Sequence, residues 1–235
     1  MKPNYSKALI IGAGAGLSAS LARLFAAKGL GLTLAARSTG DLEALAAETG
    51  ASVHACDSAD QGQVAALFSA LDAESATGGA PDVVVYNASA RVRGPFIDLD
   101  PQAVAHAVQV TAVGAFFAAQ EAVKRMQPAG HGAVLFTGAS AGVKGYPQSA
   151  SFAMGKFALR GLAQSMAREL HPKGIHIGHF VIDGGIRSAA RQDAADNPDS
   201  MLDPDAIATS YWHFLEQDRS SWAWEIELRP WVERF

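Results

Sequence analysis

Residues 10–18 read Ile10-Ile11-Gly12-Ala13-Gly14-Ala15-Gly16-Leu17-Ser18, a glycine-rich stretch between a short apolar run and a segment of helical periodicity. Glycine permits a tight turn from a strand into a helix, and it lets a pyrophosphate approach the backbone N–H groups at the helix N-terminus. Because strand, loop and helix follow one another here in that order, the stretch predicts a dinucleotide-binding site. The residues expected to contact the dinucleotide are Gly12, Gly14, Ala15, Gly16 and Leu17.

Apolar runs of strand length alternate with helical segments along the rest of the chain, which is typical of a parallel sheet covered by helices. We therefore predict an α/β fold, a Rossmann-type doubly wound sheet of about seven parallel strands with helices on both faces. The predicted strands are residues 8–11, 31–35, 52–55, 83–86, 133–136 and 175–182, with a weaker one at 224–228. The predicted helices are residues 16–28, 41–48, 61–74, 101–126, 151–170 and 204–217.

The composition is that of one globular domain. Hydrophobic residues make up 49% of the 235 residues and charged residues 18%, which is enough apolar material for a sheet buried on both faces. We expect a single dinucleotide-binding domain over residues 1–235, whose C-terminal part, 189–235, forms a substrate loop and the last helix and strand. Residues 191–200 lack an apolar period, and we expect a mobile loop there.

Charge and cysteine content exclude several classes of protein. The formal net charge is -4 and the cations are scattered, so the chain offers no basic stripe for nucleic acid. Cys56 is the only cysteine, which excludes an internal disulfide. Residues 1–7 lack a signal-peptide pattern, and we find no apolar run long enough to span a bilayer. We expect a cytoplasmic protein.

Arg37 directly follows the second predicted strand. At this place an acidic residue would accept hydrogen bonds from a ribose 2′-hydroxyl, whereas a cation would pair with a 2′-phosphate. The sequence Ala35-Ala36-Arg37-Ser38 supplies the cation and no acid, so Arg37 and Ser38 favour NADP(H) over NAD(H). The alternative is an ordinary exposed arginine at a strand end.

The segment Ser151-Phe152-Ala153-Met154-Gly155-Lys156-Phe157-Ala158-Leu159, together with the glycine-rich loop, resembles the short-chain dehydrogenase/reductase family from about residue 7 to 188. In that family the motif Tyr-x-x-x-Lys lies at the start of a catalytic helix. The tyrosine protonates the carbonyl, and the lysine lowers the pKa of the tyrosine and binds the ribose. Residues four apart share a helix face, so both point into one cleft. Lys156 matches the lysine, but Phe152 replaces the tyrosine. The resemblance therefore implies an atypical member.

The other catalytic positions implied by the resemblance also depart from the family. The serine position reads Ala139, and its neighbour Ser140 would point elsewhere unless the loop compensates, because side chains alternate along a strand. The asparagine of the preceding long helix aligns with Thr111. Tyr146 is the phenol best placed to replace the missing acid, or else a loop aromatic packing beside Pro147. Lys144 and Ser151 are weaker candidates.

The resemblance implies further cofactor contacts. Asp57 matches an acid near the adenine, and Asn87-Ala88 matches a motif after the fourth strand, although Asp and Asn are also common turn residues. The backbone of residues 182–188, with Gly184 and Ile186, is expected to pass the nicotinamide carboxamide. Ser18 stands where the family has its last glycine, and it either hydrogen-bonds a phosphate or caps the first helical turn.

Two more groups of residues have open interpretations. The four tryptophans, Trp212, Trp222, Trp224 and Trp231, either roof a substrate pocket, pack a subunit interface or close the core. None of the histidines has metal-ligand spacing, so no metal site is expected. By resemblance, the long helices 101–126 and 151–170 would form the interface of a homodimer or homotetramer.

These observations favour an NADP(H)-dependent oxidoreductase that acts on a small carbonyl or alcohol, or on an activated alkene, with a non-standard acid/base set. The candidate catalytic residues are Lys156, Tyr146, Ser140 and Thr111. The alternative is a non-catalytic NADP(H)-binding sensor or partner-binding protein on the same fold. A structural subunit that binds no nucleotide would not need Gly12, Gly14, Gly16, Arg37 and Lys156.

Overall fold

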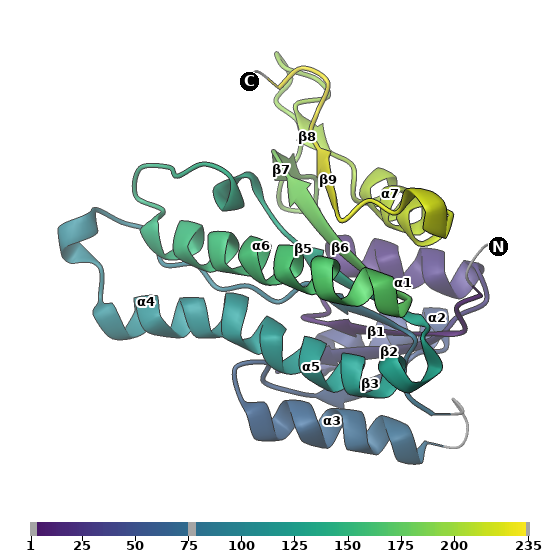
Figure 1. Ribbon diagram of the computed structural model, residues 1–235. Coiled ribbons are helices and arrows are strands. Elements are labelled where there is room, and N and C mark those ends of the chain that lie inside the picture. The colour runs from purple at the N-terminus through teal and green to yellow at the C-terminus, as the bar shows by residue number, and fades with distance from the viewer. Residues whose placement is uncertain (1–3, 75–78, 234–235) are drawn as a thin grey trace.

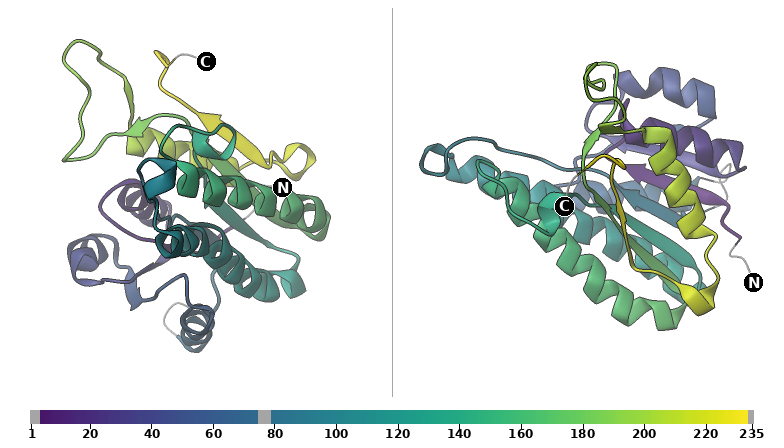
Figure 2. Two further views of the ribbon diagram at one scale, coloured as in Figure 1. Left: turned by 90° about the vertical axis from the view of Figure 1, so that its left-hand side faces the viewer. Right: turned by 90° about the horizontal axis from the view of Figure 1, so that it is seen from above.

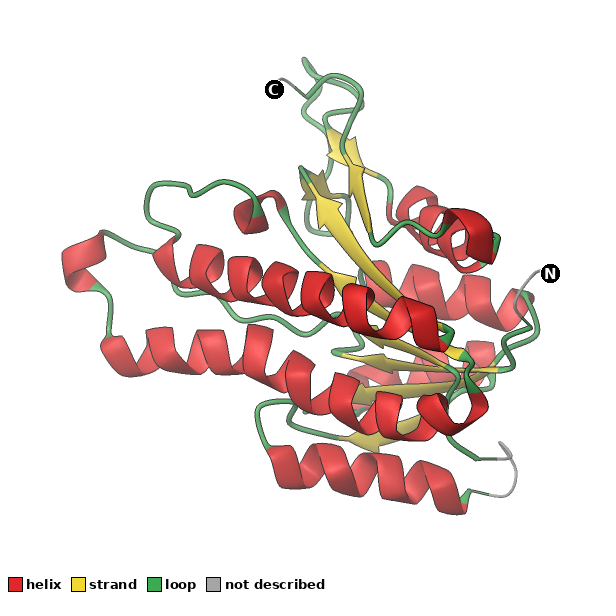
Figure 3. Ribbon diagram, in the orientation of Figure 1, coloured by secondary structure: helices red, strands yellow, loops and turns green. Residues whose placement is uncertain are grey.

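The computed structural model of the protein describes residues 4–74 and 79–233, in three layers with a parallel sheet between two sets of helices (Figures 1 and 3). The expectation that residues 1–7 contain no signal peptide concerns a segment that the structure describes only from residue 4. The sheet has the order β3-β2-β1-β4-β5-β6-β9, and all of its strand pairs are parallel. Its strands are β1 (Lys7–Ile11), β2 (Gly31–Ala36), β3 (Ser52–Ala55), β4 (Val83–Tyr86), β5 (Gly132–Thr137), β6 (Ile175–Ile182) and β9 (Glu225–Leu228). The predicted fold is confirmed.

Alternate residues of the central strands face the two helical layers. In β1, Ala8 and Ile10 belong to one buried cluster, whereas Leu9 and Ile11 belong to the other. One face is covered by α1 (Leu17–Ala27), α2 (Glu43–Thr49) and α7 (Pro204–Leu215), and the other by α3 (Gln61–Ala73), α5 (Gly114–Met126) and α6 (Ala150–Leu170) (Figure 2). Because the strands are apolar on both sides, both faces of the sheet are excluded from water.

The predicted helix 101–126 is continuous but not uniform. It consists of α4 (Pro101–Val108), a π-helical turn η3 (Gln109–Val113) and α5. Asp100 accepts hydrogen bonds from the N–H groups of Gln102 and Ala103, as expected of an N-cap. Short helical turns complete the fold: η1 (Gly40–Leu42), η2 (Phe96–Asp98), η4 (Gln127–Ala129), η5 (Ser140–Gly142), η6 (His171–Lys173) and η7 (Arg219–Ser221).

One expectation about apolar runs was wrong. The helical segment Pro101–Ala129 has 29 residues and a mean hydropathy of 1.3, so it could cross a bilayer by length and composition alone. The π-helical turn joins α4 to α5 without a break, and this is why the segment is so long. However, α5 buries Ala115, Ala118, Ala119 and Ala122 against the sheet layer. Its apolar face therefore belongs to the core of the domain.

The C-terminal part adds β9 to the main sheet and α7 to one of its faces, and it contains a small sheet of β7 (Gly185–Ile186) and β8 (Met201–Leu202). The residues between these two strands form a loop that Asp193 stabilises. The Asp193 carboxylate forms an ion pair with Arg187 (2.7 Å) and accepts a hydrogen bond from the Met201 N–H (2.8 Å). Trp212 and Trp224 pack against the two core clusters, and Trp222 stacks on the buried His176. Only Trp231 is exposed (82%), so the tryptophans mainly close the core.

Candidate active site

The carboxyl ends of the parallel strands meet at one edge of the sheet, and two adjoining cavities open there. They have volumes of about 910 and 900 Å³ and share the walls formed by Asn87 and Ser89 after β4. The strand order reverses between β1 and β4, and ligands of doubly wound sheets bind in the crevice at such a point. We refer to the cavity beside Lys156 as the substrate cavity and to the one beside Arg37 as the adenine cavity.

The glycine-rich loop lies between the two cavities. Gly12 has a φ of +81°, its N–H donates to Ala35 O (2.9 Å), and a Cβ there would lie 2.4 Å from Ala88 N. A Cβ at Gly14 or Gly16 would meet no atom within 4 Å. Gly12 is therefore required by the turn itself, whereas Gly14 and Gly16 leave open space in front of the N-terminus of α1. This space suits the pyrophosphate of a dinucleotide.

Ser18 has neither of the roles expected from the sequence. Its side chain is buried, it lines neither cavity, and α1 has no side-chain N-cap hydrogen bond. Instead, its hydroxyl donates to Gly12 O (3.1 Å) and accepts from Asn87 Nδ2 (2.8 Å). Asn87 also donates to Gly12 O (3.3 Å) and lines both cavities. Ser18 and Asn87 together hold the glycine turn in place.

Five residues that we expected to contact the cofactor line the adenine cavity: Ala15, Arg37, Ser38, Asp57 and Ala88. The side chain of Arg37 is exposed, and no carboxylate among residues 4–74 and 79–233 forms an ion pair with it. Asp57 Oδ1 accepts from the Ala59 N–H (2.9 Å), so Asp57 is a turn residue and a wall of the cavity at once. The two interpretations of Asp57 do not exclude each other.

Lys156 lies at the inner end of the substrate cavity and is buried (3% exposed). Its Nζ donates to Thr137 O at the end of β5 (2.6 Å), and burial lowers its pKa to about 8. Phe152, one turn earlier on α6, lines the same cavity with its ring centroid 5.6 Å from this Nζ. The spacing of four residues therefore brings both side chains to one face, as predicted.

The buried ammonium of Lys156 predicts a pH effect on stability. In the folded protein its pKa lies near 8, below its ordinary value of 10.5, so the unfolded chain binds more protons between these two pH values. The free energy of unfolding contributed by Lys156 should therefore rise with pH across this window and be lowest below it. Urea unfolding of the wild type and Lys156→Met at several pH values measures this. A difference between the two proteins that stays constant with pH would contradict it.

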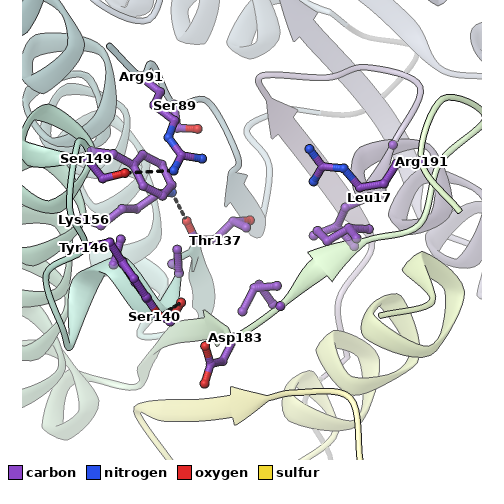
Figure 4. A pocket seen from close by; sticks show the side chains of 18 of the residues that line it. Leu17, Ser89, Arg91, Thr137, Ser140, Tyr146, Ser149, Lys156, Asp183 and Arg191 are labelled. Carbon is purple, nitrogen blue, oxygen red and sulfur yellow. Dashed lines mark hydrogen bonds between the residues drawn. The ribbon is translucent and has the colours of Figure 1, made fainter. Parts of the chain in front are cut away.

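Ser140 faces the substrate cavity, although it lies one residue after position 139, where the family has its serine. The conformation of the loop compensates for this offset. The strand alternation ends with β5 at Thr137, and η5 starts at Ser140, so Ala139 and Ser140 both line the cavity. A Cβ at Gly138 would lie 2.4 Å from the Nε2 of the buried His179, so only glycine fits at the strand exit. The hydroxyl of Tyr146, a partly exposed residue on the following loop, donates to Ser140 Oγ (3.0 Å). Both side chains are seen in Figure 4.

Thr111 does not contact the substrate cavity, and the expectation that it is a catalytic residue needs correction. It lies within the π-helical turn and is completely buried. Its hydroxyl accepts from the Ala90 N–H (3.1 Å) and packs beside Gly155 of α6. Thr111 thus positions the chain after β4. The weaker candidates Lys144 and Ser151 are not among the residues that line the cavity. Lys144 is exposed beside it, with its Nζ 3.6 Å from Asp183 and 5.7 Å from the centroid of the Tyr146 ring, whereas the Ser151 hydroxyl binds the backbone of Val92.

The remaining predicted residues, Leu17, Gly184 and Ile186, line the substrate cavity. Sequence reasoning missed several others, which share an ability to bind anions or hydroxyl groups: Ser89, Arg91, Arg93, Ser149, Arg187 and Arg191. A signal existed for part of this set. Ser89, Arg91 and Arg93 recur at every second position directly after β4, a pattern that presents three polar side chains toward the cavity.

Comparison with known proteins supports the same interpretation of the fold. A family model described as short chain dehydrogenase matches residues 6–199. A short-chain dehydrogenase from Rhodopseudomonas palustris shares the fold with a TM-score of 0.82 and 32% identity, covering 97% of this chain and 100% of that one. A metagenomic short-chain oxidoreductase in complex with NADP has a TM-score of 0.82 and 25% identity, covering 97% and 98%.

A human curated relative, 17-beta-hydroxysteroid dehydrogenase type 1, is 35% identical over 136 residues. This match covers 58% of the present chain and 41% of the human enzyme, so the chain spans less than half of that relative. The match of the family model, in contrast, includes the glycine-rich loop, Tyr146 and Lys156. The chain belongs to the short-chain dehydrogenase family.

Proposed function

We propose that the protein is an NADP(H)-dependent oxidoreductase that interconverts a small carbonyl compound and its alcohol, or reduces an activated alkene, with Tyr146 as the acid. The hydrogen bond from the Tyr146 hydroxyl to Ser140 Oγ (3.0 Å) carries this proposal. It places a phenol and a serine hydroxyl, the two groups missing at Phe152 and Ala139, in the same cavity as Lys156. In this proposal Tyr146 and Ser140 take the roles of the tyrosine and serine that are absent at positions 152 and 139.

The residues around the two cavities fit a phosphorylated nicotinamide dinucleotide. The open space at Gly14 and Gly16 receives the pyrophosphate, Arg37 and Ser38 receive the 2′-phosphate, and Asp57 and Ala88 border the adenine. Gly184 and Ile186 border the nicotinamide, and Lys156 the adjoining ribose. When bound, this cofactor supplies or accepts a hydride. The NADP held by the metagenomic relative supports the choice of cofactor.

In the direction of reduction, Tyr146 donates a proton to the substrate oxygen as the carbonyl carbon gains the hydride. Ser140 accepts the Tyr146 O–H in the absence of substrate and holds the phenol toward the cavity. The ammonium of Lys156, which is buried at the wall of the same cavity, adds positive potential there. In the direction of oxidation the Tyr146 phenolate accepts the proton.

Titration of the purified protein with NADPH and NADH, followed by fluorescence, tests the cofactor. A panel of aldehydes, ketones and activated alkenes then tests turnover. We expect NADPH to bind more tightly than NADH and at least one carbonyl to be reduced. Absence of NADPH binding at millimolar concentration would exclude the proposal. Binding without turnover, followed by carbonyl reduction in a Phe152→Tyr, Ala139→Ser double variant, would favour a non-catalytic NADP(H) sensor.

Arg37→Ala should weaken NADPH binding and leave NADH binding unchanged. A hydrogen bond between ionised groups contributes about 1.5 to 3 kcal/mol, so the dissociation constant for NADPH should rise roughly 10- to 100-fold. Isothermal titration calorimetry with both nucleotides measures the two constants. Arg23→Ala is the matched control, because Arg23 is exposed on α1 and pairs with Glu48 outside both cavities. An equal loss of affinity for NADH would show that Arg37 does not contact the 2′-phosphate.

We further propose a cytoplasmic homodimer or homotetramer that uses α5 and α6 as its interface. The exposed apolar side chains Phe116 on α5 and Met154 and Phe157 on α6 support this assignment. Small residues along both helices, such as Ala158 and Gly161, allow a second pair of helices to approach closely. Size-exclusion chromatography with light scattering measures the mass, and a monomer would contradict the proposal.

A further inference from the structure

The substrate cavity carries an excess of positive charge on its walls. Its cations are Arg91, Arg93, Lys156, Arg187 and Arg191, and its carboxylates are Asp183 and Glu233. Arg187 is neutralised by Asp193 (2.7 Å) and Asp203 (3.1 Å), and Asp183 lies 3.2 Å from Arg229, which is outside the cavity. Among the described residues, no carboxylate pairs with Arg91, Arg93 or Arg191. The cavity thus presents more guanidinium groups than its own carboxylates neutralise.

Arg91 is an exposed residue whose guanidinium is held by contacts on two sides. Its Nη2 donates to the Oγ of the buried Ser149 (3.0 Å), and its Cζ lies 4.8 Å from the centroid of the Phe152 ring. The next residue, Val92, is hydrogen-bonded to α6. Its N–H donates a hydrogen bond to Ser151 Oγ (2.9 Å), and its carbonyl accepts one from the same hydroxyl (2.9 Å). An arginine has five N–H donors, so this arrangement leaves several for a ligand.

The unpaired cations stand on opposite walls of the cavity. Arg91 and Ser149 lie on the same side as Lys156 and Tyr146, whereas Arg191 lies across the cavity beside Leu17, at the N-terminus of α1 (Figure 4). The cofactor's phosphates would lie at that N-terminus, next to Arg191. Arg91 is thus a cation available to a second anion on the side of the candidate acid, and Arg93 also lines the cavity.

We propose that the substrate carries a carboxylate, which binds Arg91 with the support of Arg93 while its carbonyl faces Tyr146 and Ser140. The inference rests on the proposed function, because it names the substrate class of the same cavity. A planar carboxylate matches the fork of an arginine, and a guanidinium fixed in advance loses little conformational entropy on binding. The net positive wall disfavours cationic substrates and gives neutral ones no compensating contact.

Phe152 acquires a function under this proposal. A phenyl ring offers its negative face to the guanidinium of Arg91, and the Nζ of Lys156 is 5.6 Å from the centroid of the same ring. The edge of the ring carries no polar group that would compete for the N–H donors of Arg91. Phe152 therefore helps to hold the guanidinium of Arg91 in the cavity.

Matched pairs of probes test the substrate class. The first pair, 4-formylbenzoate and its methyl ester, tests turnover with NADPH, and a second aliphatic pair is 5-oxopentanoate and its methyl ester. A third pair, benzoate and methyl benzoate, cannot be reduced and reports binding alone through the fluorescence of bound NADPH. The variants are Arg91→Met, Arg91→Lys and, as control, Arg168→Met, since Arg168 is exposed on α6 and lines neither cavity. Thermal melts verify that each variant is folded.

We expect each carboxylate to bind or react at least 10-fold better than its ester, in line with a charge-assisted bidentate contact. Arg91→Met should remove this ratio and leave the affinity for NADPH unchanged, Arg91→Lys should restore part of it, and Arg168→Met should retain all of it. Esters that equal or exceed their acids, or carboxylates that fail to bind the NADPH complex in every pair, overturn the inference. Weaker NADPH binding in Arg91→Met overturns it too, because Arg91 would then hold the cofactor. Absence of turnover with intact carboxylate binding counts only against the proposed function.

Discussion

Tyr146→Phe is expected to reduce turnover by roughly 10² to 10⁴, the usual contribution of a positioned general acid, with no change in the affinity for NADPH. The hydroxyl of Tyr146 is the only part of the side chain that is removed, and it donates to Ser140 Oγ in the substrate cavity (3.0 Å). The glycine loop and Arg37, which are expected to bind the cofactor, do not contact it. Steady-state kinetics on whichever carbonyl the panel identifies, together with an NADPH titration, measure both quantities.

The chain offers a matched control for this substitution. Tyr5→Phe also removes one phenolic hydroxyl, but Tyr5 stacks on His131 and lines neither cavity, so its turnover should equal that of the wild type. Ser140→Ala should give a smaller loss than Tyr146→Phe, because the serine positions the phenol and donates no proton to the substrate. Full activity in Tyr146→Phe would show that another group, or water, is the proton source.

Gly12→Ala is expected to destabilise the fold, whereas Gly14→Ala should weaken cofactor binding without destabilising the protein. At Gly12 the positive φ and the contact of 2.4 Å with Ala88 N act together. Strain of this kind and overpacking each amount to about 1 to 3 kcal/mol, so we expect the free energy of unfolding to fall by roughly 2 to 6 kcal/mol. At Gly14 an added methyl group meets no protein atom within 4 Å. It would occupy space that a pyrophosphate needs.

Urea unfolding in the absence of nucleotide and titration with NADPH separate the two effects. Gly14→Ala should unfold at the wild-type midpoint and bind NADPH at least 10-fold more weakly, a loss of about 1.4 kcal/mol. Gly12→Ala should unfold at a lower urea concentration. Equal stability of the two variants would contradict the assignment of Gly12 to the turn, and unchanged NADPH binding by Gly14→Ala would move the pyrophosphate away from this loop.

Local patterns in the sequence were sufficient to predict the layers and the cofactor edge. Successive residues of a strand face opposite sides, so a strand formed by a continuous apolar run such as Val83–Tyr86 must be buried on both faces. Residues that directly follow strands, such as Arg37 and Asp57, come to the same edge in any parallel sheet. The π-helical turn at 109–113 was not predicted, and within it Thr111 packs against Gly155 of another helix, a contact between segments distant in the sequence.

The sequence by itself determined the doubly wound sheet, the glycine turn and the position of Lys156, because each depends on a period or a spacing within one segment. Only the tertiary structure decided that Ser140 and Tyr146 share a cavity with Lys156, that Thr111 is excluded from it, and that Arg91 is held over Phe152. The bond from Arg91 to Ser149 joins residues 58 apart, and that from Val92 to Ser151 joins residues 59 apart. Loops have no hydrophobic periodicity and take their conformation from such contacts between distant residues. The orientation of their side chains is therefore determined only when the whole chain has folded.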